Sequence, residues 1–373
     1  MIVAIQPDRS RARDEEPGSD ASSPRWARFL RDAGHDVRWV DVYRPDILDQ
    51  LQGCQGFMWR WGHYEGMGRI ARRLLPVIER ELKLAAYPDQ NTCWHYDDKI
   101  AQAHLLHALR IPTARTWVWF DRHAALEWAT TCDLPIVLKL ASGAGSTNVR
   151  LVRSAEDARE WIERLFRWRL TSLDERQFPI ADRLTRIRNA IVALRKKTSG
   201  KTRIRNALIS LLLGYVAELP YADGFGAQTG CALFQEFLIG NAYDTRITVI
   251  GGRAFGFRRF NRDNDFRASG SGKIDWDPDG IDKRMIRLGF MAAHALKAQS
   301  CAIDGLYRQS EPVVGEVSYT YASWAVHECP GHWELDGNPS TGQLRWIPGQ
   351  MWPEEAQAAD FIERLKSGSL TNA

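Results

Sequence analysis

Apolar and polar residues follow one another along the first part of the chain in a pattern typical of short buried strands separated by helices. An apolar run at residues 2–5 predicts a strand, and residues 37–42 and 56–60 predict two more. Helical spacing of apolar residues fills the intervals between them. Strands that alternate with helices favour a parallel sheet, so an α/β domain is expected over residues 1–92.

Capping residues indicate where several helices begin and end. Ser23 followed by a proline predicts the N-cap of the first helix, and Gly34 predicts its end. Asp97 and Asp98 stand at the start of another helix, and Ser154 can cap a further one.

The rest of the chain predicts more strands and a second mixed unit. A glycine pair at residues 251–252 separates two apolar runs and predicts a β-hairpin. The remaining predicted strands lie at residues 115–120, 136–140, 149–152, 233–239 and 313–319, and the helices at 70–82, 124–130, 286–298 and 354–366.

Residues 171–214 differ in character from their surroundings. They contain ten lysines and arginines against three acidic residues, a local net charge of +7. Apolar residues recur there at helical intervals, which predicts a basic helical hairpin inserted into the domain. The simplest interpretation is a solvated amphipathic element, and the alternative is a surface that docks an anionic glycan or an acidic membrane.

Composition excludes several classes of protein. Fifty basic residues against 46 acidic ones leave a net charge of only +4, so nucleic-acid binding is not indicated and no DNA partner is expected. The longest apolar stretch, at 207–217, is about half the roughly 20 residues that a transmembrane helix needs. Six widely spaced cysteines without a C-x-x-C pair favour free thiols, and hence a cytoplasmic location.

Familiar catalytic motifs are missing from the sequence. Gly200-Lys201-Thr202 lacks the earlier glycine of a phosphate-binding loop, and no G-x-S-x-G elbow is present. His327, Cys329 and His332 lack zinc-protease spacing, although a metal site among them stays a minor alternative. The aromatic residues around Trp324 and Trp333 are interpreted equally well as core or as the lining of an acceptor groove.

Four features in order point to phosphate chemistry. Lys99 opens a helix, and Lys139 ends a strand just before a loop of small residues at 142–148, whose glycines allow backbone N–H groups to approach phosphates. Asp304 and Glu316 supply two carboxylates, and the second lies in an otherwise apolar strand, where an acid needs a partner. Hard oxygen ligands of this kind suit Mg²⁺.

With these features, the sequence resembles the ATP-grasp superfamily, in the branch that holds glutathione synthetase, D-alanine–D-alanine ligase and the ribosomal-protein glutamate ligase. The likeness covers roughly residues 90–320. It implies an α/β fold of the α+β ATP-grasp kind, in which a Rossmann-like parallel-sheet domain precedes a two-lobed ATP-grasp domain. The implied parts are the first domain at 1–92, the N-lobe at 93–160, the basic helical insertion at 161–230 and the C-lobe with the magnesium site at 231–373.

The resemblance also implies roles for individual residues. Lys99 and Lys139 match the lysines that hold the ATP phosphates, and the loop at 142–148 matches a flap over them. The flap contacts carried over are Ser142, Gly143, Gly145 and Ser146. The adenine edge is matched by Gln235, Glu236, Phe237 and Leu238, and the ribose contact by Asp244.

Three arginines and a metal set complete the implied site. Arg246, Arg259 and Arg267 resemble the family's phosphate- and substrate-facing arginines. Asp304 and Glu316 match its magnesium carboxylates. Ser318 stands where the family has asparagine; it keeps an oxygen and is predicted as a third ligand.

The implied activity is an ATP-dependent ligase with Mg²⁺ or Mn²⁺, joining a carboxylate to an amine or thiol through an acyl phosphate. The implied acceptor is an amino acid, a peptide or an anionic surface glycan. Two alternatives stay open: a phosphotransferase acting on a small molecule or sugar, and a nucleotide-binding protein without turnover. A homodimer is a common arrangement in the family.

Overall fold

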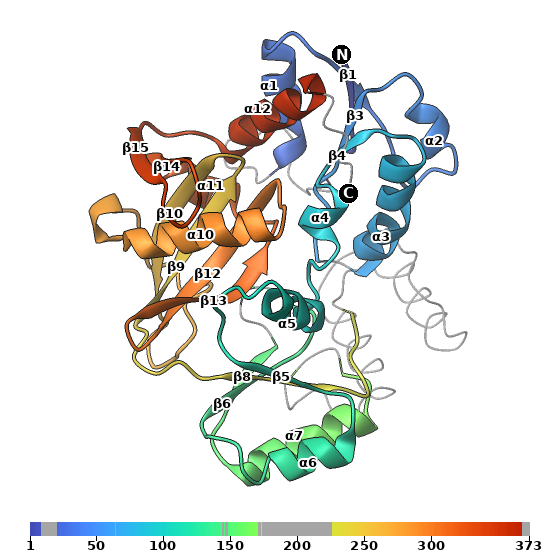
Figure 1. Cartoon of the computed structure of the whole chain (residues 1–373). Coiled ribbons are helices and arrows are strands. Elements are labelled where there is room, and N and C mark those ends of the chain that lie inside the picture. The colour runs from blue at the N-terminus through green and yellow to red at the C-terminus, as the bar shows by residue number, and fades with distance from the viewer. Residues whose placement is uncertain are drawn as a thin grey trace, which may run out of the picture.

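The computed structural model of the chain describes residues 1–8, 21–63, 65–143, 145, 148–170, 173 and 226–367. These residues form three sheets with helices packed against them (Figure 1). The predicted basic hairpin at 171–214 lies outside the described residues, apart from Leu173.

The first sheet is parallel, as the alternation of strands and helices predicts. Its strands run in the order β2-β1-β3-β4, and every neighbouring pair is parallel. They are β1 (Ile2–Ile5), β2 (Asp36–Trp39), β3 (Gly56–Met58) and β4 (Ala85–Tyr87). The helices of this part are α1 (Ser22–Asp32), α2 (Ile47–Gln50), α3 (Glu65–Arg80) and α4 (Gln90–Cys93).

The start of α1 differs from the prediction. Ala21 is the N-cap, and it makes no side-chain capping bond. Ser23 lies in the first turn instead, where its hydroxyl accepts a hydrogen bond from the Asp8 backbone at 2.9 Å. A tertiary contact therefore uses the oxygen that the prediction assigned to the cap. Gly34, with φ of +80°, does follow the helix end as predicted.

The closing helix α12 (Pro353–Lys366) packs against the first sheet rather than the C-lobe alone. Figure 1 shows it beside α1. Phe361 lies so close to Gly56 that a Cβ there would stand 2.7 Å from the ring, and Trp26 donates to Gln357 at 2.7 Å. Although its sequence falls within residues 231–373, α12 shares a core with the first domain.

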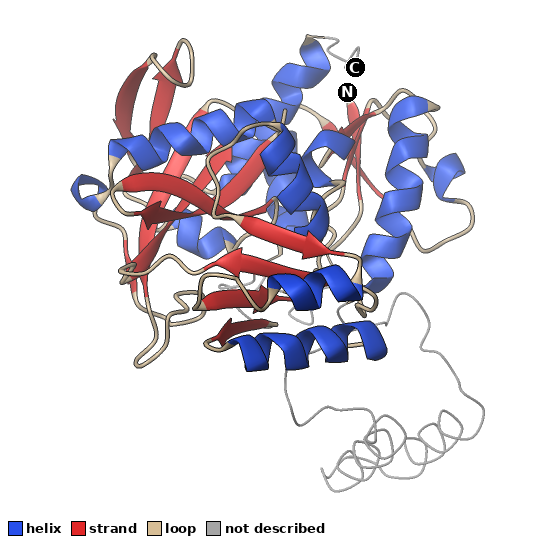
Figure 2. Ribbon diagram, turned by 60° about the horizontal axis from the view of Figure 1, so that its bottom comes forward, coloured by secondary structure: helices blue, strands red, loops and turns tan. Residues whose placement is uncertain are grey.

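The N-lobe is an antiparallel sheet in the order β5-β8-β6-β7, with α6 and α7 along one face (Figure 2). Its strands are β5 (Thr116–Trp119), β6 (Ile136–Lys139), β7 (Val149–Val152) and β8 (Ala232–Glu236), and its helices α5 (Lys99–Ala108), α6 (Arg122–Trp128) and α7 (Ala155–Arg167). Ser154 caps α7 as predicted, accepting from the Asp157 backbone at 3.1 Å.

The boundary predicted at residue 160 falls inside α7. After this helix, Leu170 and Gln228 exchange two backbone hydrogen bonds of 2.8 Å. The chain on either side of residues 174–225 therefore lies side by side at the edge of the N-lobe.

The C-lobe sheet has the order β13-β12-β9-β10-β14-β15, with β11 beside β10, and all of these pairs are antiparallel. The strands are β9 (Tyr243–Ile250), β10 (Arg253–Phe260), β11 (Ile274–Asp275), β12 (Ser300–Arg308), β13 (Glu311–Ser318), β14 (Gly331–Asp336) and β15 (Gln343–Pro348). A 3₁₀ turn at Pro278–Gly280 precedes α10 (Lys283–Ala295), and α11 (Ser323–His327) follows β13. The predicted hairpin is confirmed as β9 and β10.

One face of this sheet is the core beneath α10. Ile247, Ile303 and Val314 are buried there. Gly289 of α10 lies so close to β9 that a Cβ would stand 2.6 Å from Ile247. Because side chains alternate between the faces of a strand, Arg246 and Asp304 point to the opposite face.

Candidate active site

A cavity of about 620 Å³ is lined by residues of the N-lobe, the C-lobe and the loop that follows β3. Every predicted site residue among those that the structure describes lines it, except Ser142. Lys139 and Glu316 therefore open into one space, although they belong to different sheets.

Strand register brings the C-lobe residues of the site together. Asp304 pairs directly with Glu316 on one side and with Arg246 on the other, and Arg246 pairs with Phe257. Directly opposed residues of antiparallel strands have Cβ atoms about 5 Å apart. Side chains that are far apart in sequence thus form one row across four strands.

A β-bulge at Gly315 aims Glu316 into the cavity. The pairing of β12 with β13 shifts between Asp304 and Gly305, so Gly315 is the extra residue. Val314 and Val317 both lie in the core under α10, which strict alternation would forbid. Without the bulge, a strand that buries Val314 could not also present Glu316 beside Asp304.

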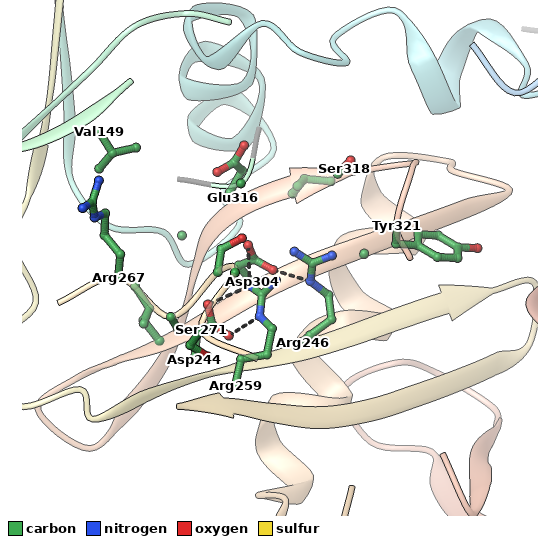
Figure 3. A pocket seen from close by; sticks show the side chains of 18 of the residues that line it. Val149, Asp244, Arg246, Arg259, Arg267, Ser271, Asp304, Glu316, Ser318 and Tyr321 are labelled. Carbon is green, nitrogen blue, oxygen red and sulfur yellow. Dashed lines mark hydrogen bonds and ion pairs between the residues drawn. The ribbon is translucent and has the colours of Figure 1, made fainter. Parts of the chain in front are cut away.

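Two arginines and two carboxylates form a bonded lattice in the floor of the cavity (Figure 3). Arg246 Nε lies 2.5 Å from Asp304 Oδ1, and Arg259 lies 2.9 Å from Asp304 Oδ2. Arg259 also donates two hydrogen bonds of 2.7 Å to Asp244. Burial alone would raise the pKa of Asp304, but the charges of Arg246 and Arg259 outweigh it and hold this pKa well below its usual range.

This lattice changes the interpretation of two predicted residues. Asp244 lines the cavity, but its carboxylate is bound bidentately by Arg259. Arg259 was expected to face phosphate or substrate, but its guanidinium group binds Asp244 and Asp304. Sequence spacing placed these side chains near the site but gave no sign that they pair with each other.

The lysines of the N-lobe side are held differently. The Lys99 amine donates to Gly143 O at 2.8 Å and lies 3.3 Å from Glu316 Oε1. Lys139 ends β6, and no acidic side chain of the described residues lies within 4 Å of its amine. Burial lowers the pKa of Lys139, against the opposing charge of Glu316.

Asp97 anchors the start of the predicted flap, a role that sequence reasoning missed. One carboxylate oxygen accepts from the Gly143 backbone at 2.9 Å, and the other accepts from the Ser142 hydroxyl. Ser142 is consequently buried against Asp97 and is not among the residues that line the cavity, and its role as a flap contact stays a prediction. Asp97 has φ of +53°, and Asp98 is the residue that caps α5. Ser146 lies outside the described residues.

The predicted adenine strand lies at the N-lobe end of the cavity. Glu236 does not project freely toward a base, because its carboxylate accepts from Arg308 at 2.6 Å and from the Arg115 backbone at 3.1 Å. Gln235 donates to the Thr116 hydroxyl at 3.2 Å. Phe237 and Leu238 follow the end of β8, and both line the cavity.

Two further predicted residues line the cavity with their polar groups engaged. Arg267 lies 2.6 Å from Asp265. The Ser318 hydroxyl donates to Thr320 O at 2.7 Å and accepts from the Thr320 backbone at 3.2 Å. This local turn occupies the oxygen that was predicted as a metal ligand.

Some of the aromatic residues near the C-terminus line the cavity and others pack in the core. Trp324 lines the cavity, whereas Trp333 is buried in the core beside Trp346. His327 stacks on Trp352 at 3.8 Å. Within the part of the chain that the structure describes, no three histidine, cysteine or acidic side chains gather as a metal cluster.

No known family profile matches the sequence. Solved structures are similar over nearly the whole chain. D-cycloserine synthetase DcsG matches with a TM-score of 0.54 and 13% identity, covering 98% of this chain and 100% of that one. The ATP-grasp ligase PsnB, complexed with a minimal precursor, matches at 0.53 and 14%, covering 97% and 98%. A RimK-domain ATP-grasp protein of Sphaerobacter thermophilus matches at 0.52 and 13%, covering 97% and 100%.

The chain has the ATP-grasp fold. The two predicted lobes of this fold are the antiparallel sheets that carry β6 and β12, and the parallel sheet is the predicted preceding domain. None of the helices in the described residues is long and apolar enough to cross a membrane.

The donor set of this ATP-grasp cavity fits a divalent cation that is shared with phosphates. Asp304 and Glu316 are cross-strand neighbours with side chains 20% and 35% exposed, so both carboxylates can be reached from the cavity. Mg²⁺ is commonly held by one or two carboxylates plus substrate phosphates and waters. A pair of carboxylates, without a larger cluster among the described residues, matches that mode.

Proposed function

We propose that this chain is an ATP- and Mg²⁺-dependent ligase that joins a carboxylate to an amine or a thiol through an acyl phosphate. One observation carries the proposal: two lysines from the N-lobe side and two carboxylates from the C-lobe open into a single cavity. The ATP-grasp fold, and the similarity to one protein named as a synthetase and one named as a ligase, support the same reaction class.

The nucleotide would lie between the lobes. Phe237 and Leu238 would meet the base at the end of β8, and the phosphates would extend toward Lys139. A buried lysine without a nearby acid gains most from an incoming anion, because the anion restores the charge partner that burial denies it. Lys99 would support the same phosphates from α5, with its position fixed by Gly143.

Asp304 and Glu316 would hold the cation. When bound, Mg²⁺ would neutralise and orient phosphate oxygens for an in-line transfer. Arg246, fixed by its bond to Asp304, would keep the remaining guanidinium N–H groups available to a substrate carboxylate.

The reaction would proceed in two steps that balance. A carboxylate oxygen would form a bond to the γ-phosphorus as the bond to the ADP oxygen breaks, giving an acyl phosphate and ADP. An amine nitrogen or thiol sulfur would then attack the acyl carbon, releasing phosphate and a proton. Preorganised cations offset the charge that develops in such steps, and removing one typically costs roughly 10²–10³ in rate.

The test is release of both ADP and phosphate by the purified protein, supplied with ATP and Mg²⁺ across pools of carboxylates and amines. The expected result is a pair of pools that yields ADP and phosphate in equal amounts. Absence of phosphate release from every pair, together with no ATP-induced thermal shift, would contradict the proposal.

The same assay separates the alternatives. A phosphotransferase acting on a small molecule or sugar would give ADP and a stable phosphorylated product without free phosphate. A nucleotide-binding protein without turnover would show an ATP-induced thermal shift and no ADP.

Three further expectations stay predictions: an amino-acid, peptide or anionic-glycan acceptor, a homodimer, and a cytoplasmic location.

A further inference from the structure

The cavity has two ends of different chemistry. Figure 3 shows Arg267 and Val149 on one side of the Asp304–Arg246 pair, and Ser318 and Tyr321 on the other. The second side, here called the distal end, is lined by His63, Tyr96, Ser318, Thr320, Trp324 and Ala325. None of these six is an acid, a lysine or an arginine.

An indole surface stands at the distal end. Trp324, in the first turn of α11, is 46% exposed although it lines a cavity. Its ring packs edge-on against Trp276, with centroids 6.3 Å apart, and Trp276 is fixed by donating to Ala325 O at 2.8 Å. A large apolar side chain that is held in place yet left open inside a cavity is typical of a ligand contact.

A row of uncharged hydrogen-bonding groups accompanies it. His63 Nδ1 lies 2.5 Å from the Tyr96 hydroxyl, which lies 2.6 Å from Thr320 Oγ1. Burial lowers the pKa of His63 and raises that of Tyr96, which keeps both groups neutral near pH 7. The row crosses from the first domain to the end of β13, along the wall of the distal end.

Charged groups border the distal end. Arg60 donates to Tyr321 O at 2.8 Å, and the charges of Arg60, Asp97 and Glu316 act on Tyr96. The Asp97 carboxylate, next to Tyr96 in sequence, binds Ser142 and the Gly143 backbone. Arg246 stands at the border of the distal end, where its Nε binds Asp304. Each of these bordering charges already has a partner in the protein, so the uncharged row supplies the hydrogen-bonding groups at this end.

We propose that the distal end binds a neutral sugar ring, which belongs to one of the two substrates of the proposed ligase. The C–H face of a pyranose would cover the Trp324 indole, and its hydroxyls would exchange hydrogen bonds with Thr320 and His63. A purely aromatic ring would cover the indole but would add no hydrogen bond to the row. This inference rests on the proposed function, since it takes the nucleotide to occupy the other end.

The experiment is saturation-transfer NMR on the full chain with AMP-PNP and Mg²⁺. One probe set contains methyl glycosides of glucose, galactose, mannose and N-acetylglucosamine; the second contains glycine, D-alanine, L-glutamate and L-lysine; indole and phenol form the third. The variants are Trp324→Ala and Thr320→Val. Trp39→Ala is the matched control, because Trp39 is 45% exposed and does not line the cavity.

At least one glycoside is expected to receive saturation in the wild type. Its dissociation constant is expected to rise about 10-fold in Trp324→Ala, as the loss of one covered aromatic face implies, and to stay unchanged in Trp39→Ala. Thr320→Val is expected to weaken the glycoside without changing any binding of indole.

Three results would overturn the inference: no glycoside signal, a glycoside signal that survives Trp324→Ala, or indole or an amino acid binding in a Trp324-dependent way in place of sugars. Calorimetry of AMP-PNP on the same samples keeps the two proposals apart. Absence of AMP-PNP binding to the wild type would contradict the proposed function. AMP-PNP binding without glycoside binding would contradict only the proposal that the distal end binds a sugar.

Discussion

The two walls of the cavity differ in how far their charged side chains are paired within the protein. On the C-lobe, two arginines and two aspartates bind one another at 2.5–2.9 Å, so the charges within this lattice cancel without any ligand. On the N-lobe, Lys139 is buried with no acid of the described residues within 4 Å, and Lys99 faces a single carboxylate.

This difference separates residues that stabilise the fold from residues that are expected to bind a ligand. The C-lobe lattice joins β9, β10 and β12 through their side chains, so each member stabilises the sheet as well as shaping the cavity. Lys139 has no acidic partner within 4 Å among the described residues, and in the proposed function a phosphate would match its charge. We therefore expect substitutions in the lattice to reduce folding stability and substitutions of Lys139 to reduce nucleotide binding.

The largest expected effect is that of Asp304→Ala. It leaves Arg246 and Arg259 without a shared partner, so the free energy of unfolding should fall by about 3 kcal/mol, the lower end for a broken buried pair. Urea unfolding followed by tryptophan fluorescence measures this change.

The control for Asp304 is Glu316→Ala. Its side chain is 35% exposed and forms one ion pair, with Lys99 at 3.3 Å, whereas Asp304 forms two, so its loss should cost less than that of Asp304, about 1–2 kcal/mol. Equal stabilities for the two variants would remove the distinction between lattice and binding residues.

Lys139→Met should separate binding from stability on the other wall. AMP-PNP affinity should fall about 10- to 100-fold, the value of a hydrogen bond to a charged group. Unfolding of the nucleotide-free protein should change by less than about 1 kcal/mol, because an apolar side chain replaces a buried cation. Calorimetry and urea unfolding measure the two quantities; a large loss of stability with normal affinity would reverse the assignment.

A smaller effect is expected from pH. Burial lowers the pKa of Lys139, so its amine loses a proton at a lower pH than the ordinary lysine value near 10.4. Only the protonated amine attracts phosphate, so AMP-PNP affinity should decline as pH rises through the alkaline range below that value. Lys139→Arg keeps its charge and should remove the decline; an unchanged slope in this variant would assign the titration to another group.

The smallest effect concerns the bulge. A Cβ at Gly315 would lie 3.2 Å from Asp304 O and from Leu306, so Gly315→Ala should cost about 1 kcal/mol and turn Glu316 slightly. We expect the Mg²⁺ requirement for AMP-PNP binding to rise about 3-fold, measured by magnesium titration. Gly252→Ala, where nothing lies within 4 Å, should behave as wild type. A similar loss in both variants would show that the bulge does not act through the proposed metal site.

Local pattern predicted much of the fold. The parallel first sheet, the β9–β10 hairpin and the cap at Ser154 follow from periodicity and turn residues within a few positions of one another. Where a distant segment competes for the same atom, local rules do not apply. Ser23 illustrates this, because its hydroxyl accepts from the Asp8 backbone and Ala21 takes the cap.

The candidate site was predictable as a set of residues but not as a set of pairs. The pairing of Asp244 with Arg259 depends on strand register, and that of Glu236 with Arg308 depends on how two sheets pack together; the sequence states neither. The sequence showed Asp97 only as part of a helix start, because its hydrogen bonds to the Ser142 hydroxyl and the Gly143 backbone depend on the folded loop. Composition and spacing indicate where charged residues gather, whereas the folded arrangement of the strands decides which of them form ion pairs.

The claim that one nucleotide–metal unit joins the two walls is tested most directly by titrating AMP-PNP into wild type, Lys139→Met, Glu316→Gln and the double variant, each with Mg²⁺ and with EDTA. Each single variant should bind at least about 10-fold more weakly with Mg²⁺. Removing Mg²⁺ should weaken the wild type and Lys139→Met, and change Glu316→Gln little. Wild-type affinity in both single variants would contradict the claim.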